Sequence, residues 1–167
     1  MKTVTSILCL LILSSCATSP NKSQSTSPSQ SGPIRLYQGP PLSKEKRVLL
    51  IAEKNDSNFT YFISVNKEKI KNRSLMSGPT EIELTPGDHS VQMRFIAKGK
   101  LAIPLQAFEK INFKAGKTYL IKSKFIFGEG SYITSAQNTR ITVWIEETSS
   151  PKKLSLMTLN GFGRKVK

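Results

Sequence analysis

Cys16 is the residue whose surroundings most clearly predict a chemical role. It follows the small residues Ser14 and Ser15, which leave room for a peptidase, and these close an apolar run over residues 4–13. About ten residues is the length of the apolar part of a signal peptide, whereas a membrane-spanning helix needs roughly 20. Lys2 supplies the weak positive charge that precedes such a run. The pattern predicts cleavage before Cys16.

The stretch Leu13-Ser14-Ser15-Cys16 resembles the lipobox that ends a bacterial lipoprotein signal peptide. The resemblance implies a diacylglyceryl group on the sulfur of Cys16 and usually a further acyl chain on its amine. One acyl chain gives marginal membrane binding, at about 0.8 kcal/mol per buried methylene, and additional chains make the anchoring stable. The alternative is a secreted protein in which the cysteine has no role.

The residue after the cysteine bears on location. Enteric bacteria place Asp there to retain lipoproteins in the inner membrane, and this chain has Ala17. We therefore expect a lipid-anchored protein of the bacterial cell envelope, in the outer membrane, at its periplasmic face or at the cell surface.

The single histidine, His89, favours a structural role. Cys9 leaves with the signal and Cys16 is modified, so the mature chain has no cysteine to complete a familiar zinc site. A serine nucleophile needs a base beside it, and His89 is the sole imidazole. We expect a half-buried side chain that hydrogen-bonds a neighbouring strand or turn.

Other candidate catalytic groups are equally weak. Glu146 and Glu147 are neighbours on a predicted strand, so they face opposite sides and do not form a working pair. Gly128-Glu129-Gly130 lacks the Lys-Ser ending and the helix of a phosphate-binding loop, and it is more typical of a hairpin tip. The sequence predicts no catalytic residue, no cofactor and no metal. An enzyme acting on envelope glycans through carboxylates from distant strands remains the less favoured alternative.

Five aromatic side chains offer a second binding hypothesis, a platform on which a sugar stacks. Aromatic residues at strand positions are more often core residues, and we favour that interpretation. The five are Tyr37, Tyr61, Tyr119, Tyr132 and Trp144.

Charge restricts the class of partner. The chain has 25 Lys and Arg against 11 Asp and Glu, for a net charge of +14, and loss of the signal removes only Lys2. Such an excess attracts polyanions, which in an envelope are lipid headgroups, lipopolysaccharide phosphates and wall polymers. The export signal argues against nucleic acid, and the basic residues do not interleave with aromatics as in an RNA-binding loop. The plain alternative is a charged surface that only confers solubility.

Composition divides the chain into four parts. Residues 1–15 are the predicted signal peptide, and residues 16–33 are the lipidated Cys16 with a Ser- and Pro-rich tether. Such a polar tether stays disordered and spans about 20–25 Å on average. Residues 34–147 are the predicted folded domain, and residues 148–167 are a basic tail. We favour a loosely attached tail, and the alternative is a strand added to the sheet through Leu154, Leu156 and Leu159.

Short β-like segments fill the domain. Turn residues separate them at 85–88, 98–100, 115–117 and 128–130, and Pro86-Gly87 fits a type II turn. No segment has sustained helical periodicity, although a short helix at 67–76 or 101–110 is compatible with the sequence. Strands and turns at this spacing predict an all-β fold, an antiparallel β-sandwich of about seven strands. The predicted strands are 48–52, 59–65, 80–84, 91–95, 111–113, 119–127 and 141–145.

Alternation within these segments predicts which side chains share a face of the sheet. The predicted sets are Tyr61, Ile63 and Val65; Ile82 and Leu84; Val91, Met93 and Phe95; Tyr119, Ile121, Ser123, Phe125 and Phe127; and Ile141, Val143 and Ile145.

Three stretches resemble known bacterial lipoproteins. Residues 82–93 are similar to the L-x-P-G-x-H-x-V-x-V hairpin of PEGA-type and related carbohydrate-binding-like sandwiches. Residues 35–42 resemble the R-x-Y-x-G-P-x-L opening of a group of uncharacterised outer-membrane-type lipoproteins, and residues 115–119 resemble their A-G-x-x-Y turn. Ser43 replaces the usual proline, and the W-x-x-W-I-x-D ending is reduced to residues 143–147. The resemblance implies the fold and the location but no activity.

These observations favour a membrane-anchored envelope lipoprotein with a non-catalytic binding or structural module. Its expected partners are the membrane, through the lipid anchor, and an anionic envelope polymer or another envelope protein. The alternative is a small subunit of an envelope or secretion assembly.

Overall fold

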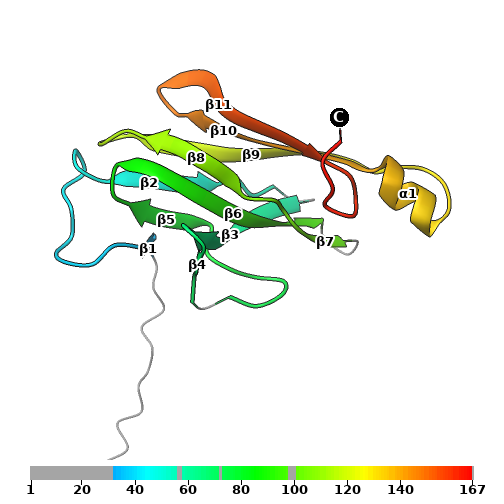
Figure 1. Ribbon diagram of the computed structural model, residues 1–167, viewed down its shortest axis with the longest axis horizontal. Coiled ribbons are helices and arrows are strands. Elements are labelled where there is room, and N and C mark those ends of the chain that lie inside the picture. Colours follow the sequence, from blue (N-terminus) through cyan, green and yellow to red (C-terminus); the bar gives the residue numbers. More distant parts are fainter. Residues whose placement is uncertain (1–31, 56–57, 72, 98–100, 167) are drawn as a thin grey trace, which may run out of the picture.

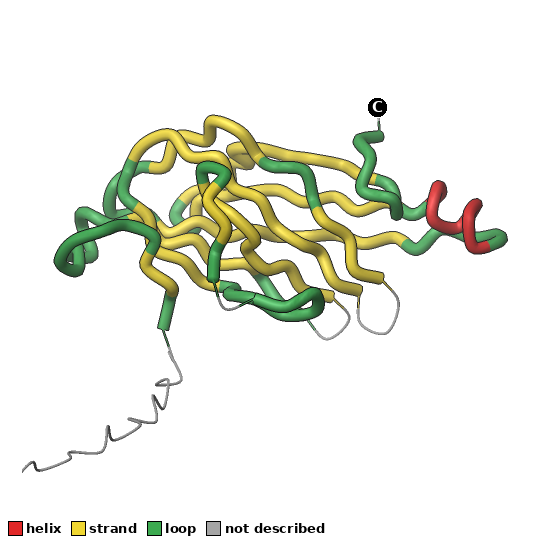
Figure 2. Tube along the Cα trace, turned by 60° about the horizontal axis from the view of Figure 1, so that its bottom comes forward, coloured by secondary structure: helices red, strands yellow, loops and turns green. Residues whose placement is uncertain are grey.

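Two β-sheets make up most of the described part of the chain, which covers residues 32–55, 58–71, 73–97 and 101–166 of a computed structural model. The sheets pack face to face, and one short helix, α1 (Tyr132–Asn138), lies beyond the strand ends (Figures 1 and 2). The predicted all-β, sandwich-like fold is confirmed.

The first sheet has six strands and mixed direction. Strands β1 and β5 pair in parallel, as do β2 and β9, whereas the remaining neighbours are antiparallel. The sheet is therefore not the purely antiparallel one that the sequence predicts. Parallel pairing of β2 with β9 is possible because a long stretch of chain separates the two strands. The strands in spatial order are β1 (Ile34–Arg35), β5 (Glu81–Leu84), β2 (Val48–Ala52), β9 (Thr118–Ile126), β10 (Arg140–Glu147) and β11 (Ser150–Leu159).

The second sheet is built around one long strand, β6. The first half of β6 pairs with β8 and the second half with β7, so two short strands share one of its edges. Its other edge pairs with β3. The strands are β4 (Glu68–Lys69), β3 (Asn58–Val65), β6 (Gly87–Ala97), β7 (Leu101–Pro104) and β8 (Phe108–Phe113).

The inward faces of both sheets form one apolar core. The predicted alternation is confirmed for β5, β6 and β10, where the inward side chains are at most 1 % exposed. Tyr119 and Ile121 of β9 are also buried, while Phe127 lies beyond the end of that strand. The confirmed inward residues are Ile82, Leu84, Val91, Met93, Phe95, Ile141, Val143 and Ile145.

The predicted common face of Tyr61, Ile63 and Val65 is wrong. The pairing of β3 with β6 shifts register between Phe62 and Ser64. Because such an irregularity breaks the two-residue alternation, Val65 joins the main core, whereas Tyr61 and Ile63 pack in a separate cluster with Ile96.

Two predicted turns connect the sheets instead of closing hairpins. The turn at residues 85–88, with Gly87 at φ 127°, leads from β5 in the first sheet to β6 in the second. Both edges of β5 are occupied, by β1 and β2, so β6 has no edge there to pair with. The hairpin implied by the resemblance is therefore not formed. The turn at 115–117 likewise joins β8 to β9.

The C-terminal segment is part of the fold, so the expectation of a loosely attached tail is wrong. Strand β11 pairs with β10 from Ile141↔Leu159 to Glu147↔Ser150, and Leu159 is fully buried. The alternative of an added strand is confirmed. Apolar side chains at positions 157 and 159 outweigh the basic character of the segment, because they complete the core.

The remaining local predictions have mixed outcomes. The segment 101–110 holds β7 and the start of β8, and the described part of 67–76 holds β4 and turns, so neither is helical. Residues 128–130 precede α1 instead of forming a tight hairpin tip. The predicted turn at 98–100 lies outside the described residues.

Candidate binding surfaces

Cys16 is the predicted site of acylation. Cys16 lies outside the described residues, as does the rest of residues 1–31. Strand β1 begins at Ile34 and pairs along β5, at the edge of the first sheet. The chain therefore enters the fold along one side of the sandwich.

His89 is held by two hydrogen bonds, as expected for a structural histidine. The Asn66 amide lies 3.0 Å from Nδ1, and the Thr85 carbonyl lies 2.8 Å from Nε2. The backbone N–H of Ser90 donates to Oδ1 of Asn66, which orients the amide nitrogen toward the ring. Because a carbonyl only accepts, Nε2 is the donor to Thr85. Both ring nitrogens are thus engaged within the fold.

A polar pocket opens beside His89, on the side of the sandwich between the edge strands β1 and β4. Its volume is about 480 Å³, and Arg35, Lys69 and Lys71 contribute positive charge to its lining. Glu68 is the acidic residue among the residues that line it. We call this the basic pocket, and its chemistry suits an anion.

The loop after β1 forms one wall of the basic pocket, and contacts with β5 and with the rest of the loop hold it in place. The guanidinium of Arg35 lies 5.6 Å from the ring centroid of Tyr37. The hydroxyl of Tyr37 accepts from the backbone N–H of Leu42 at 3.1 Å and lies 3.4 Å from a carboxylate oxygen of Glu83. Glu83 also forms an ion pair with Arg47. The wall is therefore held in place by a partly buried network.

The five aromatic residues do not form one stacking platform. Tyr61 and Tyr119 are buried, as the core interpretation predicts. Trp144 and Tyr132 contradict it, because Trp144 is half-buried on the outer face of the first sheet and Tyr132 is 84 % exposed on α1. Tyr37 lies at the basic pocket.

Trp144 is surrounded by charged side chains. Its Nε1 donates to Glu146 at 3.0 Å, and the ammonium of Lys153 lies 4.8 Å from a ring centroid. Lys122 pairs with Glu146 at 2.5 Å. Hydrogen bonds from Lys122 and then from Trp144 hold the pKa of Glu146 below its usual value. The ring is already in contact with a cation.

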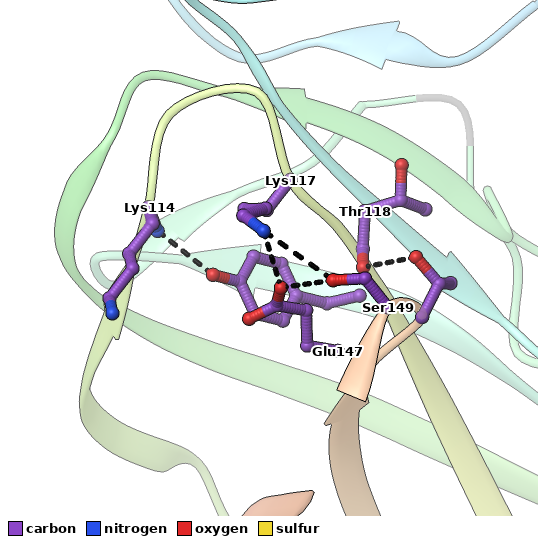
Figure 3. Close-up of polar contacts among 7 residues, drawn as sticks. Lys114, Lys117, Thr118, Glu147 and Ser149 are labelled. Carbon is purple, nitrogen blue, oxygen red and sulfur yellow. Dashed lines mark hydrogen bonds and ion pairs between the residues drawn. The ribbon is translucent and has the colours of Figure 1, made fainter. Parts of the chain in front are cut away.

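Glu147 is held by a different lysine. Lys117 Nζ lies 2.8 Å from a Glu147 oxygen, Ser149 donates to the same carboxylate, and Thr148 donates to the Thr118 carbonyl at 3.1 Å (Figure 3). The hydrogen bond from Lys117 is the main cause that lowers the pKa of Glu147. These contacts tie the β10–β11 turn to the start of β9. Glu146 and Glu147 thus have separate partners, as expected of neighbours on a strand.

Neither a cluster of metal ligands nor a membrane-spanning helix is found in the described ranges. No group of three His, Cys, Asp or Glu side chains there is placed to hold a metal ion. No helix of this part of the chain is long and apolar enough to cross a membrane.

Sequence reasoning missed two features. The basic pocket joins residues 35–38 to residues 65–71, and only the folded chain brings these segments together. An apolar surface at the α1 end was also missed, although the adjacent Tyr132 and Ile133 outside any predicted strand were a signal for it. Comparison of the chain with family models, with curated proteins and with solved structures finds no match.

Proposed function

We propose that the chain is a lipid-anchored module of the bacterial cell envelope that binds an anionic envelope polymer without catalysis. The observation that carries this proposal is the stretch Leu13-Ser14-Ser15-Cys16 after a short apolar run, because it combines a cleavage site with an acylation site. The anchor holds the module at a membrane surface, in our proposal that of the outer membrane.

The basic pocket supports the choice of ligand. Arg35, Lys69 and Lys71 surround an opening with room for a phosphate or carboxylate group of a polymer, and Glu68 is the opposing charge. Lys69 and Lys71 are exposed, so each interaction is weak alone and falls with salt. Repeated anionic groups along a polymer compensate for weak single contacts.

The experiment measures retention of the chain from residue 16 onward, with Cys16→Ser, on purified wall sacculi and on lipopolysaccharide. We expect retention at low salt and release as ionic strength rises. The double substitution Lys69→Ala and Lys71→Ala should weaken retention by about three- to tenfold, a range typical of losing two exposed charge contacts.

A matched control removes the same charge elsewhere. Lys124→Ala with Lys152→Ala takes two exposed lysines from the β9 and β11 side of the first sheet. This control should weaken retention less than the pocket variant. Equal losses in both variants, or no retention of the parent protein at low salt, would refute binding at the basic pocket.

A further inference from the structure

One end of the sandwich exposes a cluster of large apolar side chains. Five of the nine exposed large apolar residues in the described ranges lie at the end of β9, on α1 or in the turn after β11. We call these residues the apolar tip. They are Ile126 at 53 % exposure, Phe127 at 51 %, Tyr132 at 84 %, Ile133 at 61 % and Phe162 at 46 %.

The scaffold of the apolar tip is tightly bonded. The Ser135 hydroxyl donates to the Gly128 carbonyl at 2.6 Å, and the Gly128 N–H donates to the Thr139 hydroxyl at 3.1 Å. The Thr139 hydroxyl in turn donates to the Ser135 carbonyl at 2.8 Å. A seven-residue helix is unstable alone, so these buried bonds hold α1 in place.

Two glycines allow the close packing of α1. A Cβ on Gly128 would lie 2.4 Å from the Ser135 carbonyl oxygen, and one on Gly161 would lie 2.7 Å from that of Ala136. The Gly161 N–H also donates to this Ala136 oxygen at 2.8 Å. The helix is thus fixed on its inner side, while its first two residues, Tyr132 and Ile133, point an apolar pair into solvent.

A shallow apolar groove runs through the tip. Its volume is about 300 Å³, and Phe127, Tyr132, Ala136 and Phe162 are among its lining residues. Its lining residues come from α1, from the residue after β9 and from the turn after β11. A flexible apolar chain can fill such a groove.

Basic residues follow both segments of the apolar tip in the sequence. Arg140 follows α1, and its guanidinium donates to the Gln137 carbonyl at 2.6 Å, while Arg164 and Lys165 follow Phe162. Glu129 is the acidic residue of these tip segments. Aromatic and aliphatic side chains beside Arg and Lys are the combination that favours the headgroup boundary of an anionic bilayer.

We propose that the apolar tip inserts into the interfacial region of a lipid bilayer with anionic headgroups. A protein interface of ordinary stability needs about 800 Å² and 20–30 residues on each partner, which five side chains on two segments do not supply. A bilayer sets no such requirement, because its acyl chains adapt to the shape of the tip. The occupant is therefore lipid and not a second copy of the chain.

The inference rests on the proposed function, which places the protein at a bilayer. The distances along the chain allow the lipid anchor and the apolar tip to reach the same bilayer. Pairing places Ile34, Ile82, Leu50 and Tyr119 in one row across the first sheet. The segment from Tyr119 in β9 to Phe127, just after its end, covers about 25 Å, whereas residues 17–33 can reach up to about 60 Å from Cys16 when extended. One bilayer can therefore hold both the anchor and the apolar tip.

The experiment uses the chain from residue 16 onward with Cys16→Ser, which retains every described residue and has no acyl chain. Sedimentation with vesicles of phosphatidylcholine containing phosphatidylglycerol should show binding, and pure phosphatidylcholine should bind less. The double substitution Tyr132→Ser and Ile133→Ser should reduce binding by about tenfold or more. Both side chains are largely exposed in solution, so the bilayer would bury apolar area that the serines lack.

The matched control removes a similarly exposed apolar pair elsewhere. Leu75→Ser with Met76→Ser changes residues that are 66 % and 51 % exposed on the loop after β4. This control should bind vesicles like the parent protein. Equal loss in both double variants, or no binding to the anionic vesicles, would overturn the proposal.

A second measurement does not depend on a loss of binding. The Cys16→Ser chain has no other cysteine from residue 16 onward, so Ile133→Cys or Met76→Cys can carry one environment-sensitive fluorophore. Anionic vesicles should shift emission to the blue at position 133 and not at position 76. No shift at 133, or a self-association that Tyr132→Ser and Ile133→Ser abolish without vesicles, would overturn the proposal. Polymer retention at the basic pocket is unaffected by either result.

Discussion

Individual residues of this protein show where alternation along a strand fails as a guide. Glu83 lies on the outward face of β5 and is nevertheless only 6 % exposed. The loop between β1 and β2 brings Arg47 and the Tyr37 hydroxyl to it. The two-residue period gives the face of a side chain, but it says nothing about a distant loop that covers that face.

Tyr61 makes the same point on the second sheet. It faces away from the main core, yet its hydroxyl donates to the Leu75 carbonyl at 2.8 Å and the ring is fully buried. A Cβ on Gly78 would lie 2.3 Å from the ring, so the loop after β4 packs directly on it. The hydrogen bonds and partial burial of His89, in contrast, could be predicted from its position just after a turn.

The two carboxylates at the end of β10 should make the fold sensitive to acid. The folded-state pKa values of Glu146 and Glu147 lie below their usual value, mainly because Lys122 and Lys117 donate to them. Their contribution is therefore present above the unfolded-state pKa of about 4.3 and is lost as pH falls through the lower folded-state pKa. The effect is small because both lysines are open to water.

Urea unfolding between about pH 3 and pH 7 checks this expectation, since it spans both sides of the glutamate titration. The double substitution Glu146→Gln and Glu147→Gln should reduce the unfolding free energy at pH values above the glutamate titration. It should also make the unfolding free energy fall less steeply as the pH is lowered. A variant whose stability ran parallel to that of the parent protein over the whole range would show that these ion pairs do not contribute.

At the scale of the elements, seven of the eleven strands in the described ranges could be predicted, and their pairing could not. Each of the seven predicted segments overlaps a strand, because apolar alternation is a local property. The partners depend on which sheet edges are free. The connection between β5 and β6 appears in the sequence as a hairpin turn, and it joins the two sheets because β5 already lies between β1 and β2.

Strand β11 is the main difference at this scale between the sequence-based expectation and the fold, because its lysines predict a loosely attached tail. Pro151, Lys152 and Lys153 lie at the start of an edge strand, where a proline and charged residues prevent pairing with another molecule. The proline and lysines that make this segment polar are therefore consistent with a strand at the edge of the sheet.

Substitutions on the two faces of β11 test its role in stability. Leu159→Ala removes a fully buried side chain and should cost about 2–5 kcal/mol of unfolding free energy. Leu156→Ala, on the same strand and 54 % exposed, is the matched control and should change stability by about 0.5 kcal/mol or less. Chemical denaturation measures both. A Leu159→Ala protein as stable as the control would restore the view of a loosely attached tail.

At the scale of the whole molecule, the proposals assign different tasks to the side and the end of one sandwich. The chain enters along β1, beside the basic pocket, and α1 lies at the far end of the strands (Figure 1). The net charge of +14 favours approach to any anionic surface, while the pocket and the apolar tip set where contact is made. The charge was evident from composition, whereas both surfaces required the fold.

The central claim is that this sandwich is fixed to a membrane through one acylated cysteine, and mass spectrometry of the N-terminal peptide tests it most directly. Protein purified from membranes of its native bacterium should begin at Cys16 and carry the mass of a diacylglyceryl group, with or without a further acyl chain on the amine. An N-terminal peptide that begins at Met1, or an unmodified thiol at Cys16, would contradict the account.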